Sequence, residues 1–327
     1  MALLVLRCGL DDTPGDTLDA ATVEEILTRR QLDSTKLSVH DLSAVPTRRE
    51  LRFLDDTAKE ILPVDPTPSL DEISARPDVE HLGAPKRAPQ QPPEALRVIV
   101  VGTDAALSAV LTRMMRADYL WAEVGYVPVE QDSPAATNWG LPTDPAAALE
   151  VAVAGPVKPV PLIRTDAGLA VAGSATISAW DGGELTGEII VDDAILTRHE
   201  AREGIRFHGV FGARLVPMTD APGIAAVRAT GPVQSVAGTG SGFGGWLARR
   251  YSPEQLQKMA ASPLFRSALA KTPAPHGGVA PESLKSGRAV QAGGPELAVT
   301  VDGVRAKRPA ERSTFYRHLR DLQIVRL

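Results

Sequence analysis

The sequence has very little cysteine and few aromatic residues. One cysteine, Cys8, occurs in 327 residues, and aromatic side chains make up 4% of the chain. A single cysteine excludes an internal disulfide and argues against zinc sites built from cysteine and histidine. Because a reducing compartment fits this usage, we expect a cytoplasmic protein.

Long apolar runs, excess positive charge and common catalytic signatures are also missing. No segment approaches the roughly 18 uninterrupted apolar residues of a membrane span, and Met1–Leu6 meets Arg7 too early for a signal-peptide core. The net charge of −5 argues against a surface built to hold nucleic acid, so no nucleic-acid partner is expected. The six histidines show no ligand spacing, and no Gly-x-Ser-x-Gly element indicates a serine hydrolase.

The first half of the chain alternates strand and helix patterns. Val98–Val101 is a continuous apolar run of the kind found in buried parallel strands, and Asp144 before Pro145 is a typical helix start. Strands are predicted at 2–7, 37–39, 97–101 and 124–129, and helices at 22–30, 49–62, 105–116 and 146–154. This alternation predicts a doubly wound α/β domain over residues 1–155, with a flexible proline-rich insertion at 77–96.

The second half has a different pattern. Short apolar runs recur between Gly, Asp and Pro residues from 156 to 327, which predicts an antiparallel β-sandwich-like domain. Residues 237–285 interrupt it with a glycine-rich stretch and two Ser-Pro helix starts, at Ser252 and Ser262, and we interpret them as an insertion.

Four motifs follow one another in the region from the strand at 97–101 to the end of the chain. Gly102–Leu107 lies where that strand ends and the next helix begins, and Gly125–Ala136 comes after that helix. Trp139–Leu149 reads Trp-Gly-Leu-Pro-Thr-Asp-Pro-Ala-Ala-Ala-Leu. Gly287-Arg288 precedes Val299–Gly303, which reads Val-Thr-Val-Asp-Gly.

In order and spacing these motifs resemble those of the diacylglycerol-kinase and sphingosine-kinase-like family, within the NAD-kinase-like superfamily. That family has Gly-Gly-Asp-Gly-Thr-Leu at the first motif and Gly-Ile-Ile-Pro-Leu-Gly-Thr-Gly-Asn-Asp-Phe-Ala at the second. It has Leu-Gly-Leu-Pro-x-Asp-Pro-x-x-Ala-Leu at the third and Val-x-Val-Asp-Gly-Glu at the fourth. The resemblance covers roughly residues 97–327 and fits residues 1–96 only loosely.

The resemblance implies an ATP-dependent kinase of a lipid hydroxyl, with Mg²⁺ and ATP as cofactors. Phosphoryl transfer needs phosphate-binding backbone groups, a carboxylate for Mg²⁺ and a base for the acceptor hydroxyl. The resemblance places nucleotide binding at Gly102, Thr103, Asp104, Glu130, Asp132 and Ser133. It places metal binding at Asp104 and Asp220, and catalysis at Asp104 and Asp302. The implied ligand cleft lies between the two domains and is lined by 102–106, 128–134 and 302–304.

Several of these positions depart from the family pattern. Thr103, Ala105 and Ala106 stand where the family has Gly, Gly and Thr. Glu130 would place a carboxylate where phosphate should bind, and Val304 replaces the glutamate that serves as base. Our first hypothesis is therefore a degenerate family member, a pseudokinase that binds a ligand or a partner protein. The alternative is a divergent lipid kinase in which Asp104 binds Mg²⁺ and Asp302 is recruited as base.

Some of these residues also have simpler interpretations. Asp104 could cap the helix that begins at Ala105, and Asp132 and Ser133 could simply form a turn. Phe243–Tyr251 mixes aromatic and arginine side chains, which suits either a membrane interface or a helix docked on its own domain. The basic cluster Arg305–Arg312 is either a solvated hairpin or a contact for an anionic partner. A lipid or protein partner and a peripheral membrane contact thus remain open predictions.

Overall fold

The computed structural model describes two compact units. It covers residues 1–10, 20–32, 36–62, 83–88, 92, 94–200, 210–231 and 278–327. Unit 1 comprises Met1–Ser174, Pro217–Gly223 and Arg317–Leu327, and unit 2 comprises Ala175–Val216 and Ile224–Tyr316. The units thus divide the chain elsewhere than at the predicted boundary, residue 155. Most of the predicted insertions, 77–82 and 237–277, lies outside the described residues.

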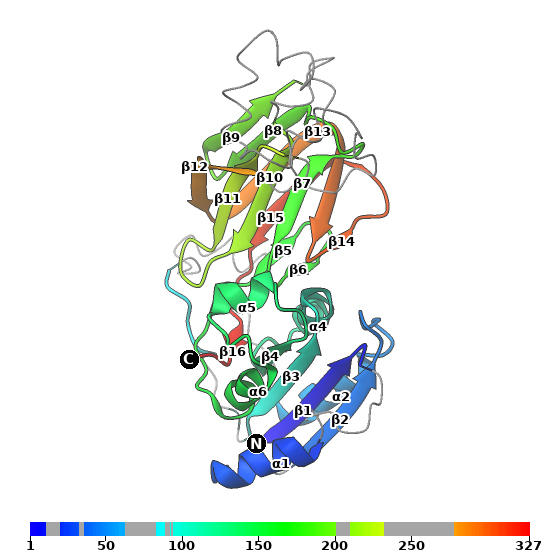
Figure 1. The fold of residues 1–327 in the computed structure, drawn as a ribbon, viewed down its shortest axis with the longest axis vertical. Coiled ribbons are helices and arrows are strands. Elements are labelled where there is room, and N and C mark those ends of the chain that lie inside the picture. Colours follow the sequence, from blue (N-terminus) through cyan, green and yellow to red (C-terminus); the bar gives the residue numbers. More distant parts are fainter. Residues whose placement is uncertain are drawn as a thin grey trace, which may run out of the picture. The chain divides into compact units, whose positions relative to one another are not determined.

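The core of unit 1 is a five-stranded parallel sheet, shown in Figure 1. The strand order is β16-β4-β3-β1-β2. The strands are β1 (Ala2–Cys8), β2 (Lys36–Leu42), β3 (Leu96–Gly102), β4 (Glu123–Pro128) and β16 (Gln323–Ile324). This confirms the predicted α/β fold for the first domain, while the return of β16 to this sheet was not predicted.

Helices cover both faces of this sheet because successive side chains of each strand point to opposite sides. Leu3 and Val5 pack with α1 (Ala20–Arg29) and α6 (Pro145–Ala154). Leu4 and Leu6 pack in a second cluster with α2 (Arg52–Ile61) and α4 (Asp104–Arg116). A short helix, α5 (Pro134–Trp139), joins the second cluster through Ala135, Ala136 and Trp139.

The helix starts agree with prediction only in part. The Asp144 side chain caps α6 as expected, accepting a hydrogen bond from Ala147 N–H at 2.8 Å. The first helix was predicted to begin at residue 22, but α1 already begins at Ala20. Helix α5 was not predicted, although Ser133-Pro134 is the same Ser-Pro start recognised at Ser252 and Ser262.

Residues 156–174 remain with unit 1 because they are bonded to α4. Ser108 donates to Ala170 O at 2.7 Å, and Thr112 accepts from Ala170 N–H at 2.9 Å. Arg116, one turn further along, donates to the carbonyls of Ala167 and Gly168. The hairpin of β5 (Ile163–Thr165) and β6 (Ala170–Val171) lies in this segment. These bonds connect residues 156–174 to α4 within unit 1.

Unit 2 is built from antiparallel strands, which confirms the predicted change of architecture. It holds β7 (Ala175–Ala179), β8 (Gly187–Val191), β9 (Ala194–His199), β10 (Gly212–Pro217), β11 (Ile224–Ala229), β12 (Val279–Gly287), β13 (Ala289–Val301), β14 (Val304–Arg305) and β15 (Ala310–Arg317). The sheet branches at β13, which pairs with β8 through 290–293 and with β7 through 297–301. Residues 279–285, assigned by prediction to the insertion, belong to β12.

A carboxylate fixes the turn before α2. Glu50 accepts hydrogen bonds from the backbone and hydroxyl groups of both Ser43 and Thr47, at 2.7 to 3.0 Å. Its bonds to Thr47 and to Ser43 lower the pKa of Glu50 from 4.5 to about 2. A lowered folded-state pKa gives stability that is present above the unfolded-state pKa and lost as the pH falls.

We expect Glu50→Gln to lower the urea midpoint at pH 7. The difference from the wild type should shrink as the pH falls from about 4.5 to about 2, where the wild-type carboxylate gains its proton. Glu60→Gln, an exposed carboxylate on α2, is the control and should show no such trend. A difference that stays constant over this pH range would contradict the assignment.

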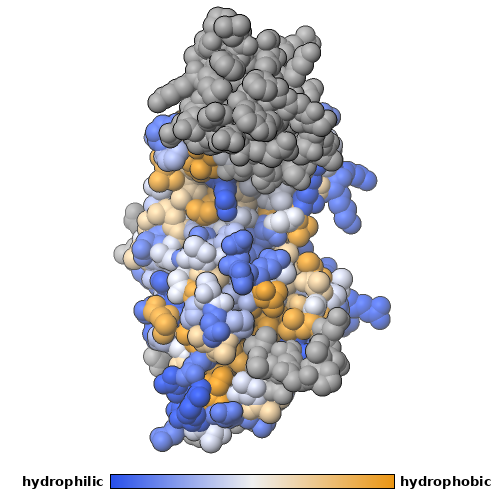
Figure 2. All heavy atoms as spheres, viewed as in Figure 1, coloured by the Kyte–Doolittle hydropathy of each residue, from blue (hydrophilic) through white to orange (hydrophobic). Residues whose placement is uncertain are grey.

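The surface of the described residues carries apolar side chains in small, separate groups on the face drawn in Figure 2. Among the described residues, no helix is long and apolar enough to cross a membrane.

Candidate functional site

The candidate site starts where β3 runs into α4. Thr103 caps the helix, because its hydroxyl accepts a hydrogen bond from Ala106 N–H at 3.3 Å. Asp104 is the first residue of the helix and lies buried, with 6% of its surface exposed. The interpretation of Asp104 as the helix cap is therefore wrong, and its carboxylate is available for other bonds.

The Asp104 carboxylate accepts three hydrogen bonds from unit 1. Oδ1 accepts from the Tyr126 hydroxyl at 2.8 Å and from the Ser133 hydroxyl at 2.5 Å. Oδ2 accepts from Ala135 N–H at 2.9 Å. The Ser133 hydroxyl also accepts from Ala136 N–H and thereby caps α5. Asp104 thus joins the end of β4 and the start of α5 to the start of α4.

The backbone of Gly173 packs closely against this carboxylate. A Cβ atom on Gly173 would lie closer to Asp104 Oδ2 than real contacts allow, and 2.6 Å from Ala135 N. Asn138 holds the glycine in place by donating to its carbonyl at 2.8 Å. The space beside Oδ2 is therefore too narrow for even a methyl group.

Burial shapes the chemistry of Tyr126. Burial and the neighbouring Asp104 carboxylate raise the pKa of Tyr126 above its ordinary value of 10. The hydroxyl therefore stays protonated and can donate a hydrogen bond. Tyr126 also lies 3.1 Å from the Gly102 carbonyl, which accepts from Val129 N–H as well. Gly102 is required by packing, since a Cβ there would lie 2.9 Å from Cys8 Cβ.

The loop between β4 and α5 separates the other predicted nucleotide-binding residues. Ser133 is buried against Asp104, whereas Glu130 and Asp132 are exposed. Two exposed carboxylates at this loop repel phosphate rather than attract it. The structure therefore brings Gly102, Thr103, Asp104 and Ser133 together and leaves Glu130 and Asp132 in solvent.

The remaining predicted residues belong to other segments of the chain. Asp220 is exposed in the turn 218–223 of unit 1, and it is not among the groups that bind the Asp104 carboxylate. Asp302 belongs to unit 2, where it and Gly303 form the two-residue turn between β13 and β14. Both turn residues have positive φ, 47° and 80°, as expected for a type I′ hairpin of sequence Asp-Gly.

The residues present do not fit a bound Mg²⁺ at Asp104. Mg²⁺ requires near-octahedral oxygen ligands, and a carboxylate offers about four lone-pair positions. Three of these positions at Asp104 are used by hydrogen bonds, and the Gly173 backbone packs closely beside Oδ2. No group of three or more His, Cys, Asp or Glu side chains able to hold a metal occurs in the described part of the chain.

Sequence reasoning missed Tyr126 and Gly173. A signal existed for Tyr126, because a tyrosine in a fully buried parallel strand must find a partner for its hydroxyl. Gly173 gave no local signal, since its packing against Asp104 depends on a segment that lies far away in the sequence.

Comparison with known proteins reveals the fold. No protein-family model matches the chain, and no curated protein matches it in sequence. Two solved structures from Bacillus anthracis str. Sterne, described as a "putative diacylglycerol kinase" and a diacylglycerol kinase, match 100% of this chain and 97% of theirs. Their TM-scores are 0.54 and 0.52, and each is 10% identical to this chain. The chain therefore has the diacylglycerol-kinase-like fold that its motifs predicted.

Proposed function

We propose that this chain is a pseudokinase with a diacylglycerol-kinase-like fold, which binds a ligand or partner protein and does not phosphorylate a lipid. The closed hydrogen-bond network around Asp104 supports this proposal most directly. The carboxylate that the resemblance assigns to Mg²⁺ accepts hydrogen bonds from Tyr126, Ser133 and Ala135 instead. Through these hydrogen bonds, Asp104 connects the start of α4 to the start of α5.

Two further changes point the same way. Glu130 and Asp132 place negative charge on the loop to which the resemblance assigns phosphate binding. Val304, which stands where the family has its base, cannot accept a proton. Together with the hydrogen-bonded Asp104 carboxylate, these two changes affect the metal ligand, the phosphate site and the base that phosphoryl transfer requires.

The alternative function is a divergent ATP-dependent lipid kinase, and the fold similarity favours it. In that case Mg²⁺ and ATP bind, Asp104 leaves its network, and Asp302 serves as base. The alternative requires that three hydrogen-bond donors around Asp104 find other partners when the metal binds.

A thermal-shift titration separates the two functions. We expect Mg²⁺-ATP to produce no saturable rise in the Tm of the protein up to millimolar concentration. In a separate transfer assay, we expect diacylglycerol to gain no labelled phosphate. A binding ligand at one hundred times its Kd would stabilise the protein by about 2.7 kcal/mol. A saturable rise with phosphate transfer would establish the kinase instead.

A double variant tests which feature prevents transfer. Glu130→Gln with Asp132→Asn removes two exposed charges and leaves the Asp104 network intact. We expect this variant to remain inactive, because Asp104 stays occupied. Activity gained by the variant would show that charge repulsion, rather than the closed carboxylate, blocks the wild type. Native mass spectrometry of the purified protein would detect a retained lipid.

A further inference from the structure

The two edges of the parallel sheet in unit 1 differ in what covers them. At the edge formed by β16, residues 157–160 run antiparallel to the end of the chain. Val160 and Leu322 exchange two backbone hydrogen bonds, at 3.0 and 2.8 Å. Lys158 N–H donates to the Ile324 carbonyl at 2.8 Å. The outward backbone groups at this edge are therefore satisfied within the chain.

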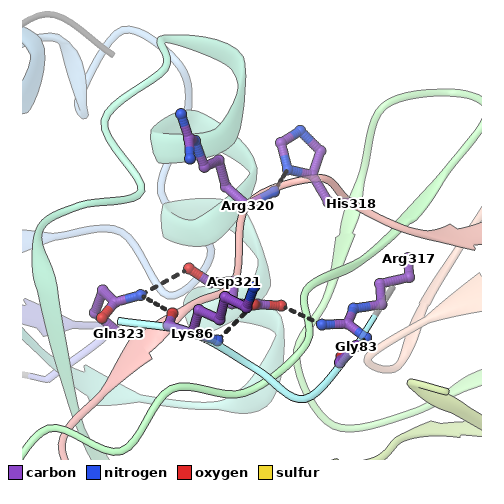
Figure 3. A network of polar contacts seen from close by, with 7 residues as sticks. All are labelled: Gly83, Lys86, Arg317, His318, Arg320, Asp321 and Gln323. Carbon is purple, nitrogen blue, oxygen red and sulfur yellow. Dashed lines mark hydrogen bonds and ion pairs between the residues drawn. The ribbon is translucent and has the colours of Figure 1, made fainter. Parts of the chain in front are cut away.

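A second segment, residues 83–88, lies against the same end of the chain (Figure 3). Lys86 N–H donates to the Asp321 carboxylate at 2.9 Å, and the Gln323 amide donates to the Lys86 carbonyl at 3.3 Å. Gln323 also accepts from Ala88 N–H at 3.2 Å. Such cover matters because a bare edge strand is a template for pairing with another chain.

The opposite edge is β2, whose one neighbour in the described part of the chain is β1 (Figure 1). Gly9 N–H donates to the Leu42 carbonyl at 2.9 Å, so Leu42 directs its backbone toward β1. Because backbone groups alternate in direction along a strand, the other even-numbered residues of β2 also face β1. The odd-numbered residues, Leu37, Val39 and Asp41, direct their N–H and carbonyl groups outward. Among the described residues, none of these outward groups has a backbone partner.

Apolar side chains on both sides of this edge are only partly buried. Leu37 and Val39 pack partly against the core cluster that contains α1, and Leu42 and Phe53 pack partly against the cluster that contains α2. A strand added to β2 would cover part of this apolar surface and satisfy the outward backbone groups. The β2 edge therefore favours another strand as its partner.

Charge on β2 favours one direction for that strand. Lys36, at the start of β2, is exposed. Near its end, the Asp41 side chain is 55% exposed, although Oδ1 lies 3.3 Å from Arg7 Nε. An antiparallel copy of β2 brings its positive end beside the negative end of the first copy. Twofold symmetry requires this direction, because a twofold dimer uses the same patch on both copies.

We propose that a second copy of this chain pairs with β2 through its own β2, which joins the two parallel sheets into one. When the pairing is centred on Val39, each outward N–H donates across the interface. Val39 then bonds to Val39 of the second copy, and Leu37 bonds to Asp41 in both directions. The backbone groups alone would accept an extended segment of any protein, whereas the charged ends match a second copy in particular. This proposal does not depend on whether Asp104 binds a metal.

Sedimentation equilibrium of the full chain tests the proposal, and we expect a reversible monomer–dimer equilibrium in the micromolar range. Val39→Pro removes an outward N–H from each copy but no bond to β1, and proline is tolerated at such edge positions. We expect this variant to raise the Kd of the dimer at least about tenfold, because two hydrogen bonds across the interface are lost. Val39→Thr is the matched control. It keeps the N–H group and a β-branched side chain, and should dimerise like the wild type.

A charge variant tests the direction of pairing. Lys36→Glu places a carboxylate beside Asp41 of the second copy at both ends of the interface, and we expect the Kd of the dimer to rise about fivefold. Lys158→Glu makes the same change of charge at the β16 edge and should dimerise like the wild type. Circular dichroism reports whether each variant folds. If Val39→Pro does not fold, the pair of charge variants carries the test, because both lysines are exposed.

Three results would overturn the proposal. A wild type that stays monomeric into the high micromolar range would leave the β2 edge to an extended segment of another protein. A folded Val39→Pro variant that dimerises as well as Val39→Thr would place the contact between copies on another surface. Equal weakening of the dimer by Lys36→Glu and Lys158→Glu would show an effect of net charge alone.

Discussion

Asp104→Asn is expected to lower the free energy of unfolding by about 2–4 kcal/mol. The asparagine amide presents an NH₂ group to a site whose other members, Tyr126, Ser133 and Ala135, are all donors there. At least one donor therefore loses its acceptor in a buried position. The measurement is a urea denaturation curve at pH 7.

Asp132→Asn is the matched control for this prediction. It removes one negative charge from the same loop, but its side chain is exposed, so the expected change lies within about 0.5 kcal/mol. If Asp104→Asn were as stable as the wild type and instead lost binding of Mg²⁺-ATP, the carboxylate would be a ligand group. That result would favour the lipid-kinase alternative.

Asp55→Asn is expected to cost about 3–5 kcal/mol, since it leaves a buried guanidinium without its carboxylate. Both carboxylate oxygens of Asp55 on α2 accept hydrogen bonds from the Arg113 guanidinium on α4. Oδ1 accepts from Arg113 Nε at 2.8 Å. The Tyr119 hydroxyl adds a third bond at 3.1 Å. The Asp55 and Arg113 side chains are 10% and 13% exposed, so water cannot replace the lost partner fully. Urea denaturation with helical circular dichroism would measure the loss.

The next residue supplies the control for this ion pair. Asp56 is exposed on the same helix, and Asp56→Asn should change stability by no more than about 0.5 kcal/mol. A combined Asp55→Leu and Arg113→Met variant should recover much of the loss, because it removes both buried charges together. Equal, small losses in Asp55→Asn and Asp56→Asn would show that the ion pair contributes little.

Local patterns in the sequence determined most elements of unit 1. The apolar run Val98–Val101 forms β3, and the Asp144-Pro145 start opens α6 as predicted. Short-range signals suffice here because burial on both faces demands a continuous apolar strand, and because a cap acts within one turn. The change to antiparallel strands after the first domain was likewise visible in the spacing of turn residues.

The role of Asp104 was decided only by the tertiary structure. Its motif predicted a metal or phosphate site, but its partners come from β4 and α5, 22 to 31 residues further along the chain. Gly173 closes the site from a segment still further away. The residue type determines which bonds a side chain can make, whereas the fold determines which hydrogen-bond donors lie close to it.

The same reason explains the contact between Lys86 and Asp321 and the place of β16. Lys86 and Asp321 lie 235 residues apart in sequence and are hydrogen-bonded in the structure. The short apolar segment Ile324-Val325 has no periodicity that could show beside which strand it lies, and in the structure β16 pairs with β4. The sequence by itself thus determined most of the strands and helices, because those choices depend on neighbours within a few residues. Only the tertiary structure decided which charges meet, because the partners of each charge come from segments that sequence spacing does not connect.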